Sequence, residues 1–171
     1  VICEYNSLFG PARKVSIPYD PGFVRSRAHH SHVFYGASIA ALEALGRQKG
    51  YALVGGNSAG NNLFFVREDA LGGLPRVAAA EAYIRASFRE SRDERGAHTF
   101  LDFEHSRQAI KALEVYDFDR RALIRVEELL ADCPEALTGF QDVLRRSHRA
   151  ARFAIGFAVH RMDHDAPVIH E

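Results

Sequence analysis

The chain has 171 residues, which is enough for one domain with a hydrophobic core or for a small domain with an extension. Its 22 basic and 22 acidic side chains balance, so bulk charge indicates neither a nucleic acid nor a membrane surface as partner. Apolar residues make up 47% of the chain, but no stretch approaches the ~20 apolar residues of a membrane-spanning helix, and no signal-peptide pattern is present. We therefore expect a cytoplasmic protein without membrane contact.

Two cysteines, Cys3 and Cys133, lie far apart and match no metal-binding spacing. Free thiols in a reducing compartment are the simplest interpretation. The chain begins with Val1, and its only methionine is Met162, so we expect further sequence upstream of Val1.

The first predicted element is a buried strand over residues 1 to 6, and its carboxyl end carries Glu4, Tyr5 and Asn6. A loop-rich segment rich in proline and glycine follows over residues 7 to 35. Polar residues at the end of a buried strand raise the question of what they face.

A helix is predicted over residues 36 to 49, where apolar side chains recur at a spacing of three residues. Ile39, Leu42 and Leu45 would share one face of this helix. Ser38 or Gly36 is expected to cap its start, and Gly50 is expected to end it.

A hairpin is predicted next, with strands over residues 51 to 56 and 61 to 67 joined by a turn that contains Asn57 and Ser58. The continuous apolar run "LFFV" at 63 to 66 predicts that the second strand is buried on both faces.

The remainder of the chain is predicted to be mainly helical. Helical patterns cover residues 78 to 87 and 104 to 113, with a charged loop over 88 to 96 between them. Two further helices are expected over residues 120 to 160, broken near Pro134. Their apolar faces would be Leu123/Val126/Leu130 and Leu137/Phe140/Leu144.

Three stretches together, "EYNSLFGP", "YGASIAALEALGRQKGY" and "NSAGNNLFFVR", resemble a family of bacterial proteins. These proteins have a class I SAM-dependent methyltransferase fold and are related to the FkbM-type methyltransferases. The resemblance covers about residues 1 to 118 and implies an α/β fold: the carboxyl-terminal part of a Rossmann-like sheet, followed by a mainly helical extension. It divides the chain into a methyltransferase-like part (1–70), a family-like extension (71–118) and a helical tail (119–171).

The resemblance implies that residues 1 to 6 form the fifth parallel strand, which ends in the substrate crevice. The strand over residues 63 to 67 should then lie between the strands at 1–6 and 51–56, antiparallel to both. The candidate site residues follow from this placement. We predict catalytic roles for Glu4 and Asn6, and substrate-binding roles for Tyr5, Tyr35 and Asn57.

The glycine-rich turn and the ribose-binding acid of such folds belong to their amino-terminal half, and this chain carries neither motif. "GGNSAG" at 55 to 60 lies in a hairpin turn, not at the start of a helix. We therefore expect no cofactor-binding residues here, S-adenosylmethionine only in the complete protein, and a chain that is inactive alone. The complete protein would act on a small molecule or sugar. The alternative is a non-catalytic protein-interaction module. The open edge of the first strand could also cause self-association.

Other polar clusters favour structural interpretations. The histidines of "RAHHSH" (His29, His30 and His32) have no carboxylate or cysteine beside them, so an exposed loop is favoured over a metal site. Ser58 is interpreted as a turn residue and not as a nucleophile. Arg89 and Arg92 are weaker candidates for anion binding within a charged, solvated loop.

Overall fold

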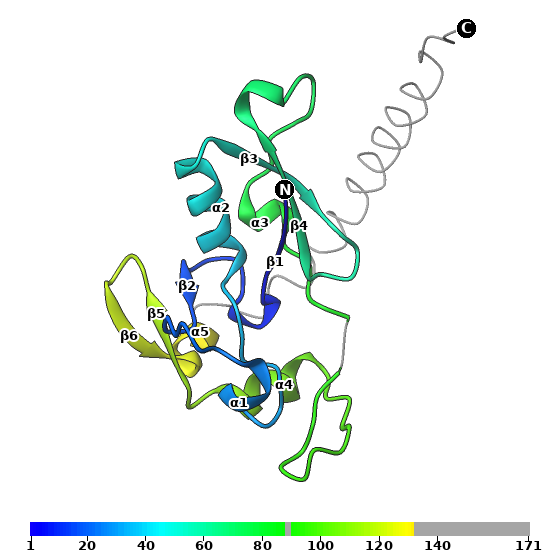
Figure 1. Cartoon of the computed structure of the whole chain (residues 1–171), viewed down its shortest axis with the longest axis vertical. Helices are drawn as coiled ribbons and strands as arrows, with labels where there is room; N and C mark the ends of the chain where they lie inside the picture. The colour runs from blue at the N-terminus through cyan, green and yellow to red at the C-terminus, as the bar shows by residue number, and fades with distance from the viewer. Residues whose placement is uncertain (88–89, 132–171) are drawn as a thin grey trace, which may run out of the picture. The chain divides into compact units, whose positions relative to one another are not determined.

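Two three-stranded antiparallel sheets organise the part of the chain that the computed structural model describes, residues 1–87 and 90–131 (Figure 1). Short helices connect and cover these sheets, so the described residues are of the mixed α/β class. The strands are β1 (Ile2–Glu4), β2 (Val15–Ser16), β3 (Tyr51–Gly56), β4 (Asn62–Arg67), β5 (Glu114–Asp117) and β6 (Ala122–Arg125). The α-helices are α1 (Arg25–Ala28), α2 (Ile39–Gln48), α3 (Ala79–Ala82), α4 (Phe103–Ile110) and α5 (Val126–Ala131). Two 3-10 turns, η1 (Ser7–Phe9) and η2 (Glu68–Ala70), complete the described elements.

The first sheet has the strand order β1-β4-β3. Strand β4 is antiparallel to both neighbours, with Cys3 opposite Leu63 and Leu53 opposite Phe65. The predicted hairpin and the predicted central position of residues 63 to 67 are both confirmed. Because β1 and β3 each run opposite to β4, they run parallel to one another.

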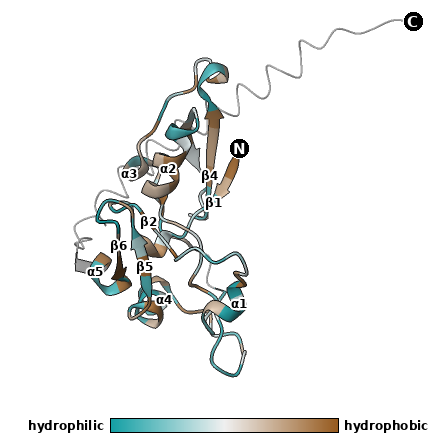
Figure 2. Cartoon of the chain, turned by 60° about the vertical axis from the view of Figure 1, so that its left-hand side comes forward, coloured by the Kyte–Doolittle hydropathy of each residue, from teal (hydrophilic) through white to brown (hydrophobic). Residues whose placement is uncertain are grey.

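Two expectations about burial in this sheet are wrong. Strand β1 is not buried, since Ile2 is 67% exposed and Cys3 is only half-buried. Strand β4 alternates instead of being buried throughout: Leu63 and Phe65 are buried, while Phe64 and Val66 are half-buried. Both apolar strands stand out in brown in Figure 2. The reason is that side chains alternate between the two faces of a strand, and in the described residues only the face of β4 that carries Leu63 and Phe65 contributes to a buried core.

Helix α2 begins and ends close to the predicted positions. The Ser38 hydroxyl caps it by accepting the backbone N–H of Ala41 at 3.2 Å. Ile39 is fully buried, but Leu45 is 48% exposed and does not share its buried face. The helix lies close to β4 at Gly46, where a Cβ atom would come within 2.7 Å of the Phe65 ring. A glycine is needed there because the aromatic ring occupies the space of a side chain.

The second predicted helical segment, residues 78 to 87, forms only the single turn α3. Beyond Ala82 the backbone N–H groups bond elsewhere. The Ile84 N–H donates to the Tyr5 hydroxyl, and the Ala86 N–H donates to the Ser7 hydroxyl. These bonds replace the helical ladder. Helix α4 is close to its predicted position but begins at Phe103, with Asp102 as its cap.

The second sheet, of order β2-β5-β6, was not predicted. Leu123, assigned to a helical face, lies instead in β6 and is 50% exposed, whereas its neighbour Ile124 is buried. This alternation is that of a strand. The helix begins only at Val126, which is fully buried. The predicted second helix, with Leu137 and Phe140, lies outside the described residues.

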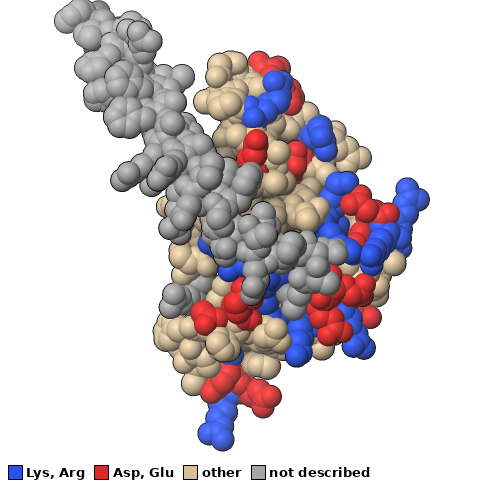
Figure 3. Space-filling model, turned by 180° about the vertical axis from the view of Figure 1, so that it is seen from behind, with Lys and Arg blue, Asp and Glu red and all other residues tan. Residues whose placement is uncertain are grey.

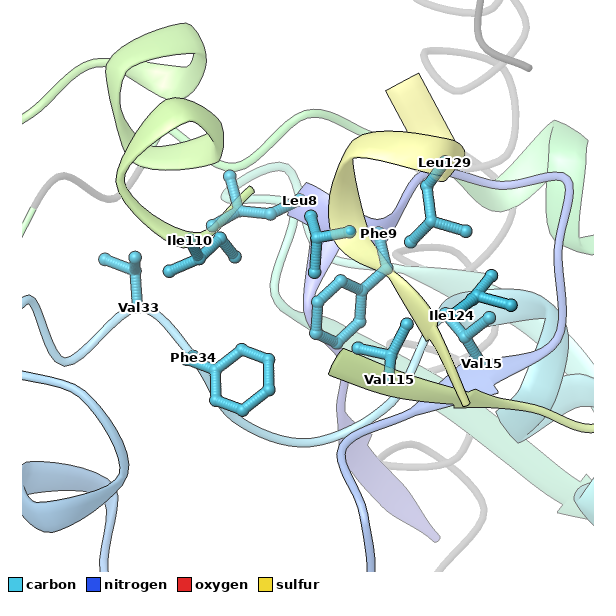
Figure 4. Close-up of a cluster of buried hydrophobic side chains, with 10 residues drawn as sticks. Leu8, Phe9, Val15, Val33, Phe34, Ile110, Val115, Ile124 and Leu129 are labelled. Atoms are coloured by element: carbon cyan, nitrogen blue, oxygen red, sulfur yellow. The ribbon is translucent and has the colours of Figure 1, made fainter. Parts of the chain in front are cut away.

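Each sheet has its own hydrophobic core. Figure 4 shows the core beside the second sheet, where side chains from η1, β2, β5, β6 and α5 point toward one another. Phe9 packs there between Val115, Val15 and Leu129, and it meets the edge of the Phe34 ring at 6.3 Å between centroids. The core beside the first sheet contains Tyr5, Ile39, Ala40, Leu53, Leu63, Phe65, Ala79, Ala82 and Tyr83.

The charged side chains visible in Figure 3 are mixed in sign, with blue and red atoms side by side over the coloured part of that face. Many of them form exposed ion pairs, such as Lys14 with Asp119 at 2.8 Å. Among the described helices, none has the length and apolar composition needed to cross a membrane.

Candidate functional site

A small pocket lies where the chain leaves the carboxyl end of β1 and enters η1. Its cavity volume of about 30 Å³ corresponds to roughly two water molecules, which is enough space for one small polar group. Seven separate segments contribute to it. The lining residues are Asn6, Ser7, Leu8, Arg25, Val33, Tyr35, Asn61, Ala86, Glu90, Phe103 and Ser106.

Asn6 is the structural centre of this pocket and is buried. Its Nδ2 group donates to the carbonyl oxygens of Val33 and Tyr35 at 2.9 and 3.0 Å. Its Oδ1 atom accepts the backbone N–H of Leu8 at 3.1 Å. Both amide hydrogens and one oxygen lone pair are therefore used within the chain. Asn6 holds η1 against residues 33–35, and these hydrogen bonds fix the backbone position of Tyr35, which lines the pocket.

Tyr5 points away from the pocket into the core of the first sheet. Its hydroxyl donates to the Ile84 carbonyl at 2.8 Å and accepts the Ile84 N–H at 3.1 Å. Burial raises the pKa of Tyr5 to about 12, more than the backbone hydrogen bond to Ile84 lowers it. Tyr5 thus stays neutral and fixes the segment that carries Ala86, a wall residue.

Tyr35 does line the pocket, and its ring carries the Arg25 guanidinium at 4.2 Å from the ring centroid. Burial raises the pKa of the Tyr35 phenol, the negative charge of Glu4 raises it further, and Arg25 acts in the opposite direction. The phenol is therefore a neutral hydrogen-bonding group at physiological pH. Glu4 itself is exposed and does not line the pocket, but its charge acts on Tyr35.

Asn57 lies in the turn between β3 and β4, outside the pocket. Its Oδ1 atom accepts the N–H groups of Asn61 and Asn62, and its Nδ2 group donates to the Asn61 side chain at 2.7 Å. Asn57 therefore orients Asn61, which is the pocket residue of this turn. Of the five predicted site residues, the structure brings Asn6 and Tyr35 together in the pocket wall.

The pocket residues from α4 and from the segment before it were not predicted from the sequence. Phe103 and Ser106 come from the first turns of α4, and Glu90 comes from the segment before it. The spacing of Phe103, Ser106 and Ile110 on one helical face was a usable signal, because a serine between two apolar positions on a buried face indicates a polar contact. Arg25 and Asn61 carried no comparable signal.

The remaining polar clusters have structural partners. His29 and His30 stack at 4.2 Å between ring centroids, and His29 Nδ1 is 2.7 Å from the Ser31 hydroxyl. In the described part of the chain, no group of three histidine, cysteine or acidic side chains is arranged to hold a metal ion. Arg92 donates to the Gly96 carbonyl at 2.8 Å, and Arg89 lies outside the described residues.

Comparison with known proteins found no match: no family model, curated protein or solved structure matches the chain.

Proposed function

We propose that this chain is the carboxyl-terminal part of a SAM-dependent methyltransferase-like domain that acts on a small molecule or sugar in the complete protein. The observation that carries the proposal is the strand order β1-β4-β3 of the first sheet, in which β4 lies antiparallel between two parallel strands and α2 directly precedes β3. The resemblance of residues 1 to 118 to that family led us to expect this strand order. The strand order supports the proposal but does not by itself define a reaction.

The outer edge of β1, which pairs with no strand among the described residues, also supports the proposal. Val1 exchanges both backbone hydrogen bonds with Phe65, at 2.7 and 2.8 Å, and the Tyr5 N–H donates to Asn61. In an antiparallel pair these bonded positions alternate with unbonded ones, so the backbone groups of Ile2 and Glu4 face away from β4. This edge is where the rest of a larger sheet would pair.

The pocket lies at the carboxyl end of β1, where open α/β sheets place their ligands. In the proposed function Tyr35 would hydrogen-bond the substrate, and Asn6 would hold that wall in place. The exposed carboxylate of Glu4 would accept a proton at the mouth of the crevice. The roles of Tyr5 and Asn57 would be indirect, through the segments that they orient.

The described residues do not fit S-adenosylmethionine. After β1 the chain turns directly into η1, and no strand in the described residues is followed by a glycine-rich turn and a helix with a downstream acid. S-adenosylmethionine supplies an electrophilic methyl group where it is bound. We place its site in the part of the sheet that would pair with β1.

The test compares this chain with the product of its complete reading frame. Calorimetric titration with S-adenosylmethionine should give saturable binding to the complete product and none to residues 1–171 alone. The Glu4→Gln variant of the complete product should retain cofactor binding but lose turnover on its substrate. Saturable binding by the isolated chain would contradict the proposal, as would a complete product that does not bind the cofactor. The second of these results would favour the interaction module.

A further inference from the structure

The pocket contains hydroxyl groups that the chain itself leaves without partners. Ser106 lines the cavity and is only 6% exposed, yet its hydroxyl has no hydrogen-bond partner among the described residues. Ser7 is 2% exposed, and its hydroxyl oxygen accepts the Ala86 N–H at 3.0 Å, but no described residue accepts its hydroxyl hydrogen. Buried hydroxyls are normally hydrogen-bonded, because their burial otherwise costs free energy. These two groups therefore indicate that a polar group completes the pocket.

Glu90 contributes a carboxylate with free acceptor atoms to the lining. Its Oε1 atom lies 3.7 Å from Arg92 Nη2 and 3.8 Å from His98 Nε2, and both distances are too long for a hydrogen bond. Arg92 is held in this place by its own bond to the Gly96 carbonyl at 2.8 Å. The Glu90 carboxylate can therefore still accept an N–H or O–H group in the pocket.

Arg25 contributes the opposite charge to the same lining. Its guanidinium lies over the Tyr35 ring, 4.2 Å from the centroid, and its Nε atom donates to the His32 carbonyl. Among the described residues, no ion pair joins Arg25 to Glu90 or to another acidic side chain. Two residues of opposite charge thus line one small cavity without direct contact between their charged groups.

The charges just outside the lining keep this balance. Arg92 adds a positive charge beside Glu90, and Glu4 adds a negative charge that acts on Tyr35. A carboxylate in the pocket would be attracted by Arg25 but repelled by Glu90, and an ammonium group would meet the reverse. A neutral group that carries both a donor and an acceptor meets neither repulsion.

We propose that the pocket selects a neutral substrate group that donates and accepts hydrogen bonds at once, a carboxamide or a hydroxyl, and that Glu90 and Arg25 determine this specificity. Glu90 accepts the N–H or O–H of the group, and Arg25 donates to its oxygen. The hydroxyls of Ser7 and Ser106 can donate or accept. The cavity volume of about 30 Å³ suits one such group. Because the inference names the substrate class of the proposed site, it rests on the proposed function.

The test titrates the 171-residue chain with four small probes at constant ionic strength set by sodium chloride. Acetamide and ethanol are the neutral probes, acetate is the anion, and methylammonium is the cation. Two-dimensional NMR should show saturable shifts at the backbone amides of Asn61, Ala86 and Ser106 with a neutral probe. Acetate and methylammonium should bind about tenfold more weakly. The neutral probe that binds more tightly identifies the substrate group.

Two results would overturn the inference. One is the absence of saturable shifts with both neutral probes, which would leave water as the occupant of the pocket. The other is acetate or methylammonium binding as tightly as the neutral probes, which would show that the opposite charges in the lining do not balance.

Two variants should reverse the selectivity, which a merely structural role would not do. Glu90→Gln leaves Arg25 unopposed in the lining and should make acetate bind about tenfold more tightly than methylammonium. Arg25→Gln leaves Glu90 unopposed and should favour methylammonium instead. The Glu90 side chain is 44% exposed, so Glu90→Gln still decides the matter if Arg25→Gln does not fold. An unchanged order of the four probes in Glu90→Gln would overturn the inference.

Exposed residues provide matched controls. Glu94→Gln removes a negative charge from the same loop as Glu90, and Arg47→Gln removes a positive charge from α2. Both variants should keep the wild-type order of the four probes. If Glu94→Gln changed the selectivity as much as Glu90→Gln, the effect would come from overall charge and the site would be overturned.

These titrations contain no S-adenosylmethionine, so their outcome is separate from that of the proposed function. Selectivity for a neutral probe, in a chain whose complete product does not bind the cofactor, would keep the site and remove the methyltransferase proposal. Cofactor binding by the complete product without selectivity among the probes would do the reverse.

Discussion

The two sheets of this chain are built in different ways. Most of the first sheet comes from elements that are contiguous in sequence, since α2, β3 and β4 follow one another between residues 39 and 67 and only β1 is distant. The second sheet joins the two-residue strand β2 to β5, with Val15 opposite Asp117. Its core draws on η1, residues 33 and 34, and α4 through α5. The pocket therefore lies where a locally specified region meets one assembled from distant segments.

The largest effect is expected in the core of the second sheet, which we call the second region. Phe9→Ala removes a ring that is 2% exposed from the centre of that core, and it should lower the free energy of unfolding by about 3–5 kcal/mol. Urea denaturation measures the change. Phe118→Ala removes a ring that is 49% exposed and should cost no more than about 0.5 kcal/mol. Similar losses in both variants would mean that the second region has no core of its own.

The second prediction concerns the hairpin turn of the first region. Gly60 has φ +76°, and a Cβ atom there would lie 2.6 and 2.7 Å from the carbonyl oxygens of Ile84 and Arg85. Gly60→Ala should cost about 2–4 kcal/mol, from strain plus overlap with backbone. Gly36 has φ +68° but open space around it, so Gly36→Ala should cost only about 1–2 kcal/mol. Equal costs would show that the turn does not press on residues 84–85.

The third prediction tests the acid sensitivity of the second region. Burial acts to raise the pKa of Asp117, but the backbone N–H groups of Arg120 and Asp119 and the Arg13 side chain outweigh it and lower the pKa. A lowered pKa contributes stability above the unfolded value of about 3.9, and this contribution is lost as the pH falls below it.

Asp117→Asn should therefore cost about 1–2 kcal/mol at neutral pH, and its melting temperature should fall less steeply below pH ~4 than that of the wild type. Thermal melts across this range measure the effect. Asp119→Asn, at an exposed ion pair, should follow the wild-type profile. If the melting temperature of Asp117→Asn depends on pH in the same way as that of the wild type, the lowered pKa of Asp117 is contradicted.

The smallest effect is expected at Tyr5 in the first region. Tyr5→Phe leaves the Ile84 carbonyl and N–H without their partner and should cost about 1 kcal/mol. Because folding raises the pKa of Tyr5 to about 12 from about 10 in the unfolded chain, its contribution is complete below pH ~10 and is lost as the pH rises toward 12. A pH titration of the folded chain, followed by phenolate absorbance, should show one fewer tyrosine with a raised pKa in this variant than in the wild type. An unchanged titration would contradict the buried position of the phenol.

The first sheet could be predicted because its signals are local. The cap at Ser38, the turn at Asn57 and the apolar run before Arg67 each act within a few residues, and together they define a helix and a hairpin. Burial was harder to predict, because it depends on which face of the sheet is covered. Leu45 and Ile2 are apolar residues on sides that nothing described covers closely.

The second sheet was missed because β2 is two residues long and carries no periodicity. Strand β6 passes directly into α5, so Leu123 and Val126 have a helical spacing although they belong to different elements. Of the site, Asn6 and Tyr35 could be proposed from the end of β1. Arg25 and Asn61 could not, because contacts between distant segments place each of them in the pocket wall.

The insertion of β4 between β1 and β3 also sets an order of assembly. The β3-β4 hairpin closes over a short turn and forms on the microsecond scale, whereas the contact between Cys3 and Leu63 closes a long loop. Strand β3 has no bonds to β1 of its own, so we expect the hairpin to form first and then to dock as a unit through β4. We therefore expect hydrogen exchange to protect the β3-β4 amides before those of β1 during refolding, and the pocket to close only at that later step.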